Sequence, residues 1–144
     1  MTADSSDPPP HRIVNPGSLP DPSGYSHAVV ATSGRTVYVA GQTAHGRDGT
    51  IPDGLVEQFD AAAANVVTAL DAAGARPNHL VSMLIFTTDL AGYLAASEPI
   101  GRAYRQHFGK HFGAKGLIEV KGLVGGATIE LVCVAVIPED DASE

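Results

Sequence analysis

The hydrophobic pattern changes its period along the chain, and each period predicts one kind of element. Two runs rich in β-branched residues, 27–32 and 36–44, flank a Ser-Gly-Arg turn signal and predict two strands joined as a β-hairpin. From residue 55 to residue 75 the apolar positions recur at steps of three and four, which predicts an amphipathic helix ended by Gly74. The first half of the chain is therefore expected to form strand, strand and helix.

The second half of the chain adds a strand, a helix and two further strands. A buried strand is predicted over residues 79–90 and a helix over residues 90–112, with glycine and proline making the start of the helix irregular. The last two strands are predicted at 115–123 and 127–137. The order β-β-α-β-α-β-β predicts an α+β fold in which both helices pack on one face of a sheet.

The last predicted strand is apolar at nearly every position from 131 to 137. Such a run is typical of a strand that is buried on both faces. Two helices on one face leave the other face of the sheet open, and an apolar open face needs a partner. We therefore expect a homo-oligomer with closed cyclic symmetry.

The two ends of the chain differ in composition from its centre. We expect residues 1–14 to form a flexible lead, residues 15–137 a single domain and residues 138–144 an acidic tail. The polar, proline-rich start lacks the hydrophobic segment of a signal peptide, and no apolar run approaches the ~20 residues that span a bilayer. These features predict a cytoplasmic protein with no membrane partner.

Composition and charge narrow the class of partner. Hydrophobic residues make up 44% and charged residues 17% of the chain, as in globular domains. Sixteen acidic side chains against nine basic ones give a net charge of −7, which argues against a broad nucleic-acid surface. The single cysteine, Cys133, excludes an intramolecular disulfide and, between two valines, is expected to be a core residue.

The sequence contains no strong signature of a metal or cofactor site. His107 and His111 stand four residues apart at the end of the second predicted helix, but no carboxylate lies in the turn between them. Cationic side chains are also favoured at a helix C-terminus for electrostatic reasons, so we interpret the two histidines as a surface pair. No phosphate-binding glycine loop occurs, and Ser26 and Ser33 lack the context of a hydrolase nucleophile. We expect no metal and no cofactor.

Six short segments occur in one order over most of the chain. They are PSGYSHAV, VYVAGQT, EQFDAAAANV, RAYRQHF, AKGLIEV and ATIELVCVAV. Together they resemble the Rid family (YjgF/YER/L-PSP proteins), whose best-known members are enamine/imine deaminases, and the resemblance covers about residues 15–137. It implies a chorismate-mutase-like α+β fold with one mixed sheet, a homotrimer, and ligand clefts between the subunits.

The resemblance also implies a site. In the deaminating members an arginine of a P-A-R-S motif holds the substrate carboxylate, and the matching segment here is GAKG, with Lys115 at the arginine position. Glu130 matches the glutamate that orients a water, so Lys115 and Glu130 are the candidate catalytic residues. Tyr25 and Gly41 match a cleft tyrosine and a cleft glycine.

Four further residues belong to the implied substrate-binding site or depart from its pattern. Gln42, beside Gly41, is a candidate hydrogen-bonding residue of the pocket. Gly116 and Leu117 follow Lys115, at positions where small polar residues or cysteine are usual in the family. Gly101 occupies the position of a pocket asparagine. The implied ligand is a small carboxylate.

Lys115 is the residue on which the functional hypothesis depends. A guanidinium binds a carboxylate through two parallel donors, whereas an ammonium is a mobile point charge that attracts an anion but orients it poorly. Deamination of small 2-imino acids is therefore expected to be less efficient than with arginine. A second interpretation makes Lys115 an ordinary surface charge, in one row with Glu119 and Lys121.

Glu130 lies between two apolar neighbours in the last predicted strand. A carboxylate in such a setting is costly unless it is paired or hydrogen-bonded. This favours either a functional role, in which Glu130 orients a water, or a structural pairing with Lys115 across a subunit interface.

Three functions remain open at this point. The first is a hydrolase or deaminase that acts on a small imine, enamine or related unsaturated carboxylate. The second is a non-catalytic trimer that binds small carboxylates and has lost deaminase activity. The third is an endoribonuclease of the L-PSP type, against which the net charge of −7 and the lack of a basic stripe argue.

Overall fold

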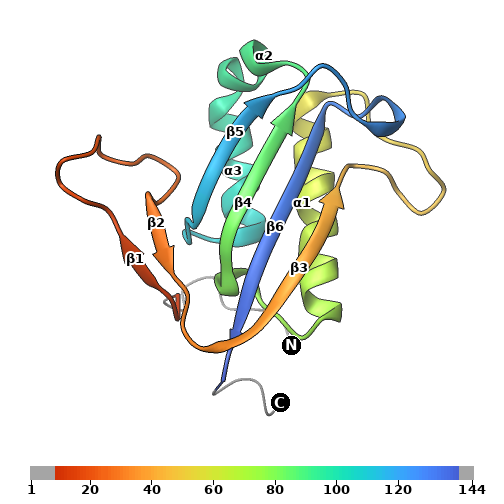
Figure 1. Ribbon diagram of the computed structural model, residues 1–144. Helices are drawn as coiled ribbons and strands as arrows, with labels where there is room; N and C mark the ends of the chain where they lie inside the picture. The colour runs from red at the N-terminus through yellow and green to blue at the C-terminus, as the bar shows by residue number, and fades with distance from the viewer. Residues whose placement is uncertain (1–8, 140–144) are drawn as a thin grey trace.

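A four-stranded mixed sheet forms the centre of the protein (Figure 1). The structure is a computed structural model that describes residues 9–139. The strand order is β3 (Gly34–Gln42), β6 (Ile129–Pro138), β4 (Leu80–Thr87) and β5 (Ala114–Glu119). β6 pairs antiparallel with both of its neighbours, and β4 pairs parallel with β5. The predicted α+β class with a mixed sheet is confirmed.

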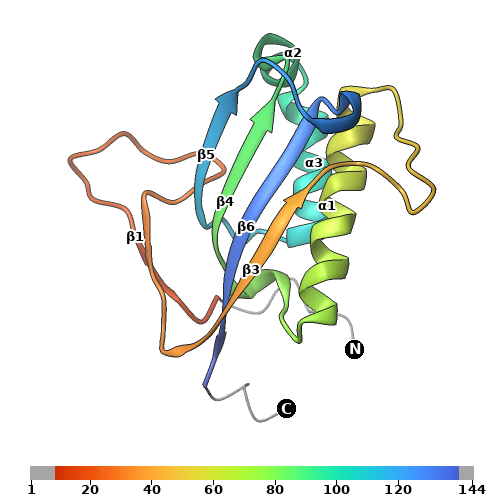
Figure 2. The ribbon, with the colours of Figure 1, turned by 45° about the vertical axis from the view of Figure 1, so that its right-hand side comes forward.

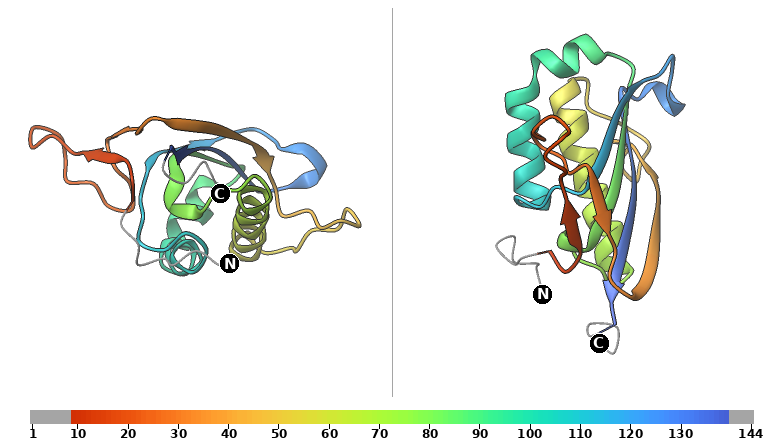
Figure 3. Two further views of the ribbon diagram at one scale, coloured as in Figure 1. Left: turned by 90° about the horizontal axis from the view of Figure 1, so that it is seen from below. Right: turned by 60° about the vertical axis from the view of Figure 1, so that its left-hand side comes forward.

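Three α-helices cover one face of this sheet (Figures 2 and 3). They are α1 (Leu55–Ala72), α2 (Leu90–Ala95) and α3 (Ser97–Phe108). The prediction of two helices is wrong, because the chain breaks at Ala96 and divides the second predicted helix into α2 and α3. Two 3-10 helices, Pro77–His79 and Val124–Gly126, lie in the connections.

The break has a local cause in the sequence. Asp89 accepts a hydrogen bond of 2.9 Å from the backbone N–H of Gly92 and so begins α2 as its N-cap residue. Proline at position 99 has no N–H to donate, and it is tolerated in the first turn of a helix but not in its interior. A new helix that begins at Ser97 places this proline in its first turn.

The hydrophobic core lies between the helices and the sheet. α1 contributes its apolar stripe at helical spacing, and β4 and β6 contribute alternate side chains. Members that are almost fully buried include Phe59, Val66, Leu70, Ile85, Leu131 and Cys133. Cys133 is the core residue that its sequence context predicts.

The predicted hairpin between residues 27–32 and 36–44 is wrong. The strand β2 (Ala28–Val30) pairs with β1 (Arg12–Val14) in a separate two-stranded sheet, and the chain then crosses below the main sheet to its far edge (Figure 1). Gly34 is part of β3 rather than of a tight turn, and it pairs with Pro138. A Cβ atom at Gly34 would overlap the carbonyl oxygen of Ile137, so this close backbone approach requires glycine.

His11 attaches the first strand to the main sheet. Its Nε2 lies 3.1 Å from the carbonyl oxygens of both His79 and Val136, and its Nδ1 accepts from the backbone N–H of Thr32 at 3.1 Å. The imidazole is buried, and these bonds use both ring nitrogens. The polar contacts therefore explain a histidine in the interior at this position.

The predicted ends of the chain are described only in part. Residues 1–8 of the predicted lead lie outside the described residues, and Arg12–Val14 of that lead form β1. Of the predicted acidic tail, Pro138 ends β6, and residues 140–144 lie outside the described part of the chain. None of the helices within residues 9–139 combines the length and the apolar character that a membrane-spanning segment needs.

The face of the sheet opposite the helices carries exposed apolar side chains. Tyr38 is 81% exposed, Ile118 40% and Leu84 38%. On this face the side chains of Val132 and Val134 are half-buried, while their neighbours on β6 face the helices and are buried. Within one chain, β6 is therefore covered on one side, and the expected burial of both faces is not reached.

Candidate functional site

An open cavity lies between α3, the edge strand β5 and the loop that precedes β2. Its volume is about 740 Å³, within the range of small-molecule sites. The wall is largely apolar and aromatic, with a few polar groups. Lining residues include Tyr25, Phe59, Tyr93, Tyr104, Phe112 and Lys115.

Lys115 reaches this cavity because of its register in the sheet. On β5 it lies beside Met83 of β4, which in turn pairs with Cys133 of β6, and both partners belong to the core beneath the helices. Side chains of paired positions project to the same face. Lys115 therefore projects to the helix side of the sheet and not to the open face.

The ammonium of Lys115 is held by aromatic rings. Its Nζ lies 3.4 Å from the centroid of the Tyr104 ring and 5.0 Å from that of Phe112, and the two rings stack with centroids 5.4 Å apart. Such contacts attract a cation through the ring quadrupole. Among residues 9–139, no carboxylate forms an ion pair with Lys115. A cation without an acidic partner thus lies inside the cavity.

Burial lowers the pKa of Lys115 to about 7. The cause is the loss of water around the ammonium, which disfavours its charged form. The side chain is therefore poised between its charged and neutral forms near neutral pH, and an anion in the cavity would favour the charged form. Perturbation of this kind, in a cleft, is common at functional sites.

The aromatic floor is fixed by a hydrogen bond. The hydroxyl of Tyr104 donates to the carbonyl oxygen of His111 at 2.7 Å, and burial raises the pKa of Tyr104 above its ordinary range. The phenol therefore stays protonated and engaged with the backbone. Its ring, rather than its hydroxyl, is the part offered to Lys115 and to a ligand.

Tyr25 comes to the same cavity from the loop before β2. The next residue, Ser26, ties this loop to the edge of the main sheet, because its backbone N–H donates to the carbonyl oxygen of Gly113 at 3.0 Å and its Oγ donates to that of Phe112 at 2.6 Å. The ring of Tyr25 packs edge-on against His27, with centroids 5.2 Å apart. The loop thus forms one wall of the cavity at the β5 edge.

Glu130 and Gly41 form a second group that is not part of the cavity wall, and Gln42 adjoins Gly41 in sequence without lining the cavity. Glu130 pairs with Phe86 of β4, which pairs with Ile118 of β5, so its side chain belongs to the open face. A Cβ atom at Gly41 would lie 2.6 Å from Oε2 of Glu130. The carboxylate of Glu130 therefore occupies the space that a side chain at position 41 of β3 would need, so only glycine fits at that position. A register shift between Val39 and Gln42 places these residues at a bulge of the strand.

Arg105 of α3 is a second cation in the cavity wall, and sequence reasoning did not identify it. It follows Gly101 by one helical turn, and both residues line the cavity. The signal was available in the sequence, since positions four apart on a helix share one face. Sequence analysis identifies the missing side chain at Gly101, but it does not identify Arg105 as the residue whose side chain lies in the space this leaves.

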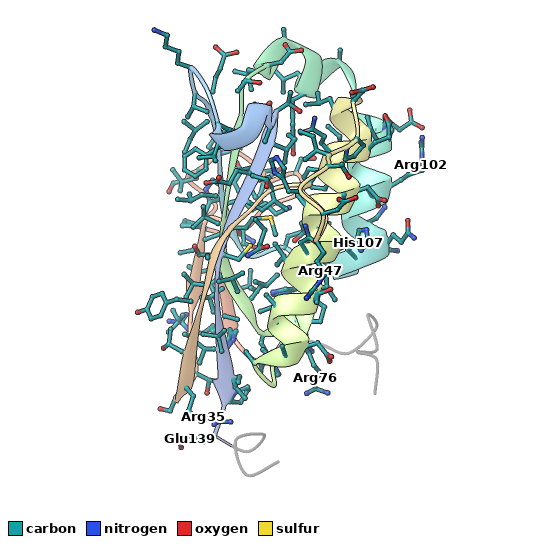
Figure 4. All side chains as sticks on the ribbon, turned by 90° about the vertical axis from the view of Figure 1, so that its right-hand side faces the viewer. Arg35, Arg47, Arg76, Arg102, His107 and Glu139 are labelled. Atoms are coloured by element: carbon teal, nitrogen blue, oxygen red, sulfur yellow. The ribbon has the colours of Figure 1, made fainter. Side chains whose placement is uncertain are left out.

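The other candidate chemistry does not converge on the cavity. His107 lies between α3 and α1, where its Nε2 is 2.7 Å from Oδ1 of Asp60 (Figure 4), whereas Nε2 of His111 donates to the carbonyl oxygen of Leu80 at 2.7 Å. The two rings thus bind different partners rather than forming a surface pair. Burial raises the pKa of Cys133 to about 12, so this thiol stays protonated. Among the described residues, no group of three or more His, Cys, Asp and Glu side chains could hold a metal ion.

Comparison with known proteins identifies the family. The sequence profile of the family described as Endoribonuclease L-PSP matches residues 18–137. The chain belongs to this family. The match spans the four-stranded sheet except for its last residue, together with the three α-helices, and the family includes the proteins called Rid.

Several curated relatives of this Rid/L-PSP protein carry a deaminase name. The chain is 30% identical over 130 residues to the 2-iminobutanoate/2-iminopropanoate deaminase of Capra hircus, covering 87% of this chain and 89% of that protein. It is 33% identical over 113 residues to the RutC family protein UK114 of Drosophila melanogaster, covering 77% of this chain and 78% of that one. The first of these two relatives supports a relationship to the deaminases.

A solved structure shares the fold closely. The Rid protein YyfB from Yersinia pestis superimposes with a TM-score of 0.78 at 30% identity, and the match covers 88% of this chain and 98% of that one. Of the residues that the Rid resemblance selected, four line the cavity, namely Tyr25, Lys115, Gly116 and Leu117. The other three, Gly41, Gln42 and Glu130, lie away from it. The two groups do not meet within one chain.

Proposed function

We propose that this protein is a hydrolase that deaminates a small imine or enamine carrying a carboxylate. The observation that carries the proposal is the ammonium of Lys115, which lies over the Tyr104 ring inside the cavity without an acidic partner among the described residues. A carboxylate of the substrate would supply that partner. The names of the curated relatives support imine deamination as the reaction.

The reaction needs a water molecule as well as a cation. Its oxygen adds to the carbon of the C=N bond, and a proton moves to nitrogen to give a carbinolamine, which then expels ammonia and leaves the 2-oxo acid. Lys115 binds the carboxylate, and a general base orients and deprotonates the water. We assign this second role to Glu130.

Lys115 and Glu130 project to opposite faces of the sheet, so the proposal requires more than one subunit. We propose a homotrimer in which the open face of one subunit packs beside the cavity of the next, and brings its Glu130 to the neighbour's Lys115. The exposed apolar side chains of Tyr38, Leu84 and Ile118 support burial of this face. Closed symmetry would then repeat the cleft at each interface.

Release of ammonia from freshly generated 2-iminobutanoate and 2-iminopropanoate tests the reaction. The protein is expected to accelerate release over buffer, and Glu130→Gln is expected to remove the acceleration. Glu119→Gln is the matched control, because Glu119 is an exposed glutamate that accepts from the backbone N–H of Leu90 at 2.9 Å, away from the cavity wall. No acceleration by the wild-type protein would refute the deaminase proposal for these substrates.

Mixed assemblies test the shared cleft. Lys115→Met and Glu130→Gln subunits, each strongly impaired alone, are expected to regain activity when they are dissociated and reassembled together. With random mixing, about a quarter of the interfaces would pair an intact Lys115 with an intact Glu130. Activity that stays absent in verified mixed oligomers would show that the two side chains do not act across an interface.

Binding of a small carboxylate is expected to weaken as the pH rises above about 7. Only the charged form of Lys115 attracts the anion, and its pKa in the free protein is about 7. Above that value the charged fraction, and with it the apparent affinity, falls about tenfold per pH unit. Below it the lysine is fully charged, and the affinity is constant until the ligand itself becomes protonated.

Calorimetric titration with 2-oxobutanoate at a series of pH values measures this profile. Lys115→Arg is the control, because a guanidinium stays charged throughout and its affinity should remain flat to about pH 9. The same variant distinguishes a catalytic site from a site that only binds. If the site is catalytic, the two parallel donors of the arginine guanidinium are expected to raise the deamination rate. A flat wild-type profile would contradict the role given to Lys115.

A non-catalytic carboxylate-binding protein is the second candidate function. The lysine, which orients an anion poorly, and the small Gly101 in the cavity wall favour it. It predicts binding of 2-oxo acids by the wild-type protein together with no ammonia release by either the wild type or Lys115→Arg.

A further inference from the structure

The guanidinium of Arg105 lies against Gly101 in the cavity wall. A Cβ atom built on Gly101 would lie 3.2 Å from Nη1 of Arg105 and 4.0 Å from its Cζ and Nη2. The side chain therefore folds back over the preceding turn of α3, in the direction that helical side chains favour. Glycine at position 101 provides the space in which this guanidinium lies.

Arg105 has no acidic partner among the described residues, although an acidic residue is near. Glu98 also lines the cavity, but its Oε1 accepts from Nη1 of Arg102 at 3.1 Å. The donors of Arg105 are therefore available to a ligand. An arginine that has no acidic partner and lies in the wall of a cavity is suited to bind a carboxylate through two parallel hydrogen bonds.

The cavity thus presents two cations from two different elements. Lys115 projects from β5, and Arg105 from α3. A ligand with one carboxylate would neutralise one of them and leave the other without a partner. A ligand with a carboxylate at each end would neutralise both, and a cavity of about 740 Å³ has room for a chain of several carbon atoms between them.

We propose that Arg105 is a specificity-determining residue that binds a second carboxylate, so that the cavity prefers small dicarboxylates, such as the 2-imino acid of an acidic amino acid and its 2-oxo product. Lys115 binds the carboxylate next to the reacting carbon, and Arg105 binds the distal one. This inference rests on the proposed function for the ligand class. It adds the identity of the group at the far end of the ligand.

Two ligands of equal chain length test the preference. 2-Oxoglutarate and 2-oxopentanoate differ in whether the far end carries a carboxylate or a methyl group, and both are stable in solution. Titration calorimetry at one fixed ionic strength is expected to give a dissociation constant about tenfold lower for 2-oxoglutarate, as for a charge-assisted pair of hydrogen bonds. Equal or weaker binding of 2-oxoglutarate would overturn the inference.

Substitution of Arg105 localises the preference. Arg105→Met is expected to bring the two affinities together by weakening only the binding of 2-oxoglutarate, and Arg105→Lys to retain part of the difference. Arg47→Met removes the same charge from an exposed residue of the loop before α1 that is not part of the cavity wall, and it should keep the full preference. Because Arg105 is exposed, its replacement should not prevent folding, which circular dichroism can verify.

The outcomes separate this inference from the proposed function. Ammonia release by the wild-type protein with no preference for 2-oxoglutarate, or with a preference that survives Arg105→Met, would overturn the role of Arg105 alone. A preference that depends on Arg105 without ammonia release from any imine would overturn the deaminase proposal alone. Failure of both ligands to bind would overturn the dicarboxylate site.

Discussion

Replacement of Lys115 by methionine is expected to lower kcat/KM for small 2-imino acids about 100-fold, the effect of losing one preorganised donor at an active site. Methionine is similar in length and apolar, so it can remain against the Tyr104 ring while the charge is lost. Both the positioning of the substrate and its affinity depend on that charge. Ammonia release and titration with 2-oxobutanoate measure the two effects separately.

The same variant is expected to be more stable than the wild type at low pH. The pKa of Lys115 is lowered to about 7 in the folded protein from an ordinary value near 10.5, so the unfolded chain binds more protons between these values. Burial of Lys115 therefore lowers the free energy of unfolding by its full amount below pH 7. This loss disappears as the pH rises toward about 10.5. The difference between Lys115→Met and wild type in urea unfolding should follow this course.

Lys110→Met provides the control for both measurements. Lys110 is an exposed lysine five positions before Lys115 and is not part of the cavity wall. Its replacement changes the net charge by the same amount, but is expected to leave activity and the pH dependence of stability unchanged. An equal loss of activity in the two variants would show that the effect comes from overall charge and not from the cavity.

The part of the fold that follows from local pattern could be predicted. Apolar positions at steps of three and four lead to α1, and the predicted strand at 127–137 corresponds to β6, an inner strand of the sheet. These predictions succeed because side-chain periodicity directly reflects which face of an element is buried. They need no knowledge of what lies opposite.

Predictions that depended on pairing failed. The glycine at position 34 suggested a turn, but the structure requires a glycine there for another reason. The backbone of Ile137, a residue distant in sequence, approaches it too closely for a side chain. A pattern read locally cannot distinguish a glycine in a turn from one that accommodates another strand. β1 was missed for the same reason, because its stabilising partners, including the His11 contacts to His79 and Val136, come from elsewhere in the chain.

The candidate site could likewise be predicted only where the information is local in sequence. Motif resemblance selected Lys115 and Glu130, but their faces depend on the register of β5 and β6, which the sequence does not encode locally. Arg105 belongs to no motif and becomes visible only when the space above Gly101 is seen to be filled by its guanidinium. Lys115 and Gly101, the two positions at which the sequence is expected to depart from the family pattern, both line one cavity and should be analysed together.

Replacement of Phe59 by alanine is expected to lower the free energy of unfolding by about 3–5 kcal/mol, as for other large aromatic residues in a core. Phe59 is 0% exposed, and its ring packs edge-on against Tyr93 with centroids 6.2 Å apart. Removal of the ring leaves a void that its neighbours on α1 and the sheet fill only in part. Chemical denaturation with a fitted midpoint and slope measures the change.

The consequence reaches the cavity, because Phe59 and Tyr93 both form part of its wall. Loss of the Phe59 ring makes this part of the wall more mobile and admits water beside the ligand. Phe59→Ala should therefore also weaken binding of 2-oxobutanoate in conditions where the variant remains folded. Leu94→Ala on α2 is the matched control, since Leu94 adjoins Tyr93 in sequence but is 57% exposed and should change stability by less than about 0.5 kcal/mol. A loss of stability at Leu94 as large as that at Phe59 would mean that α2 is buried against another surface, and the wall of the cavity would then extend beyond a single chain.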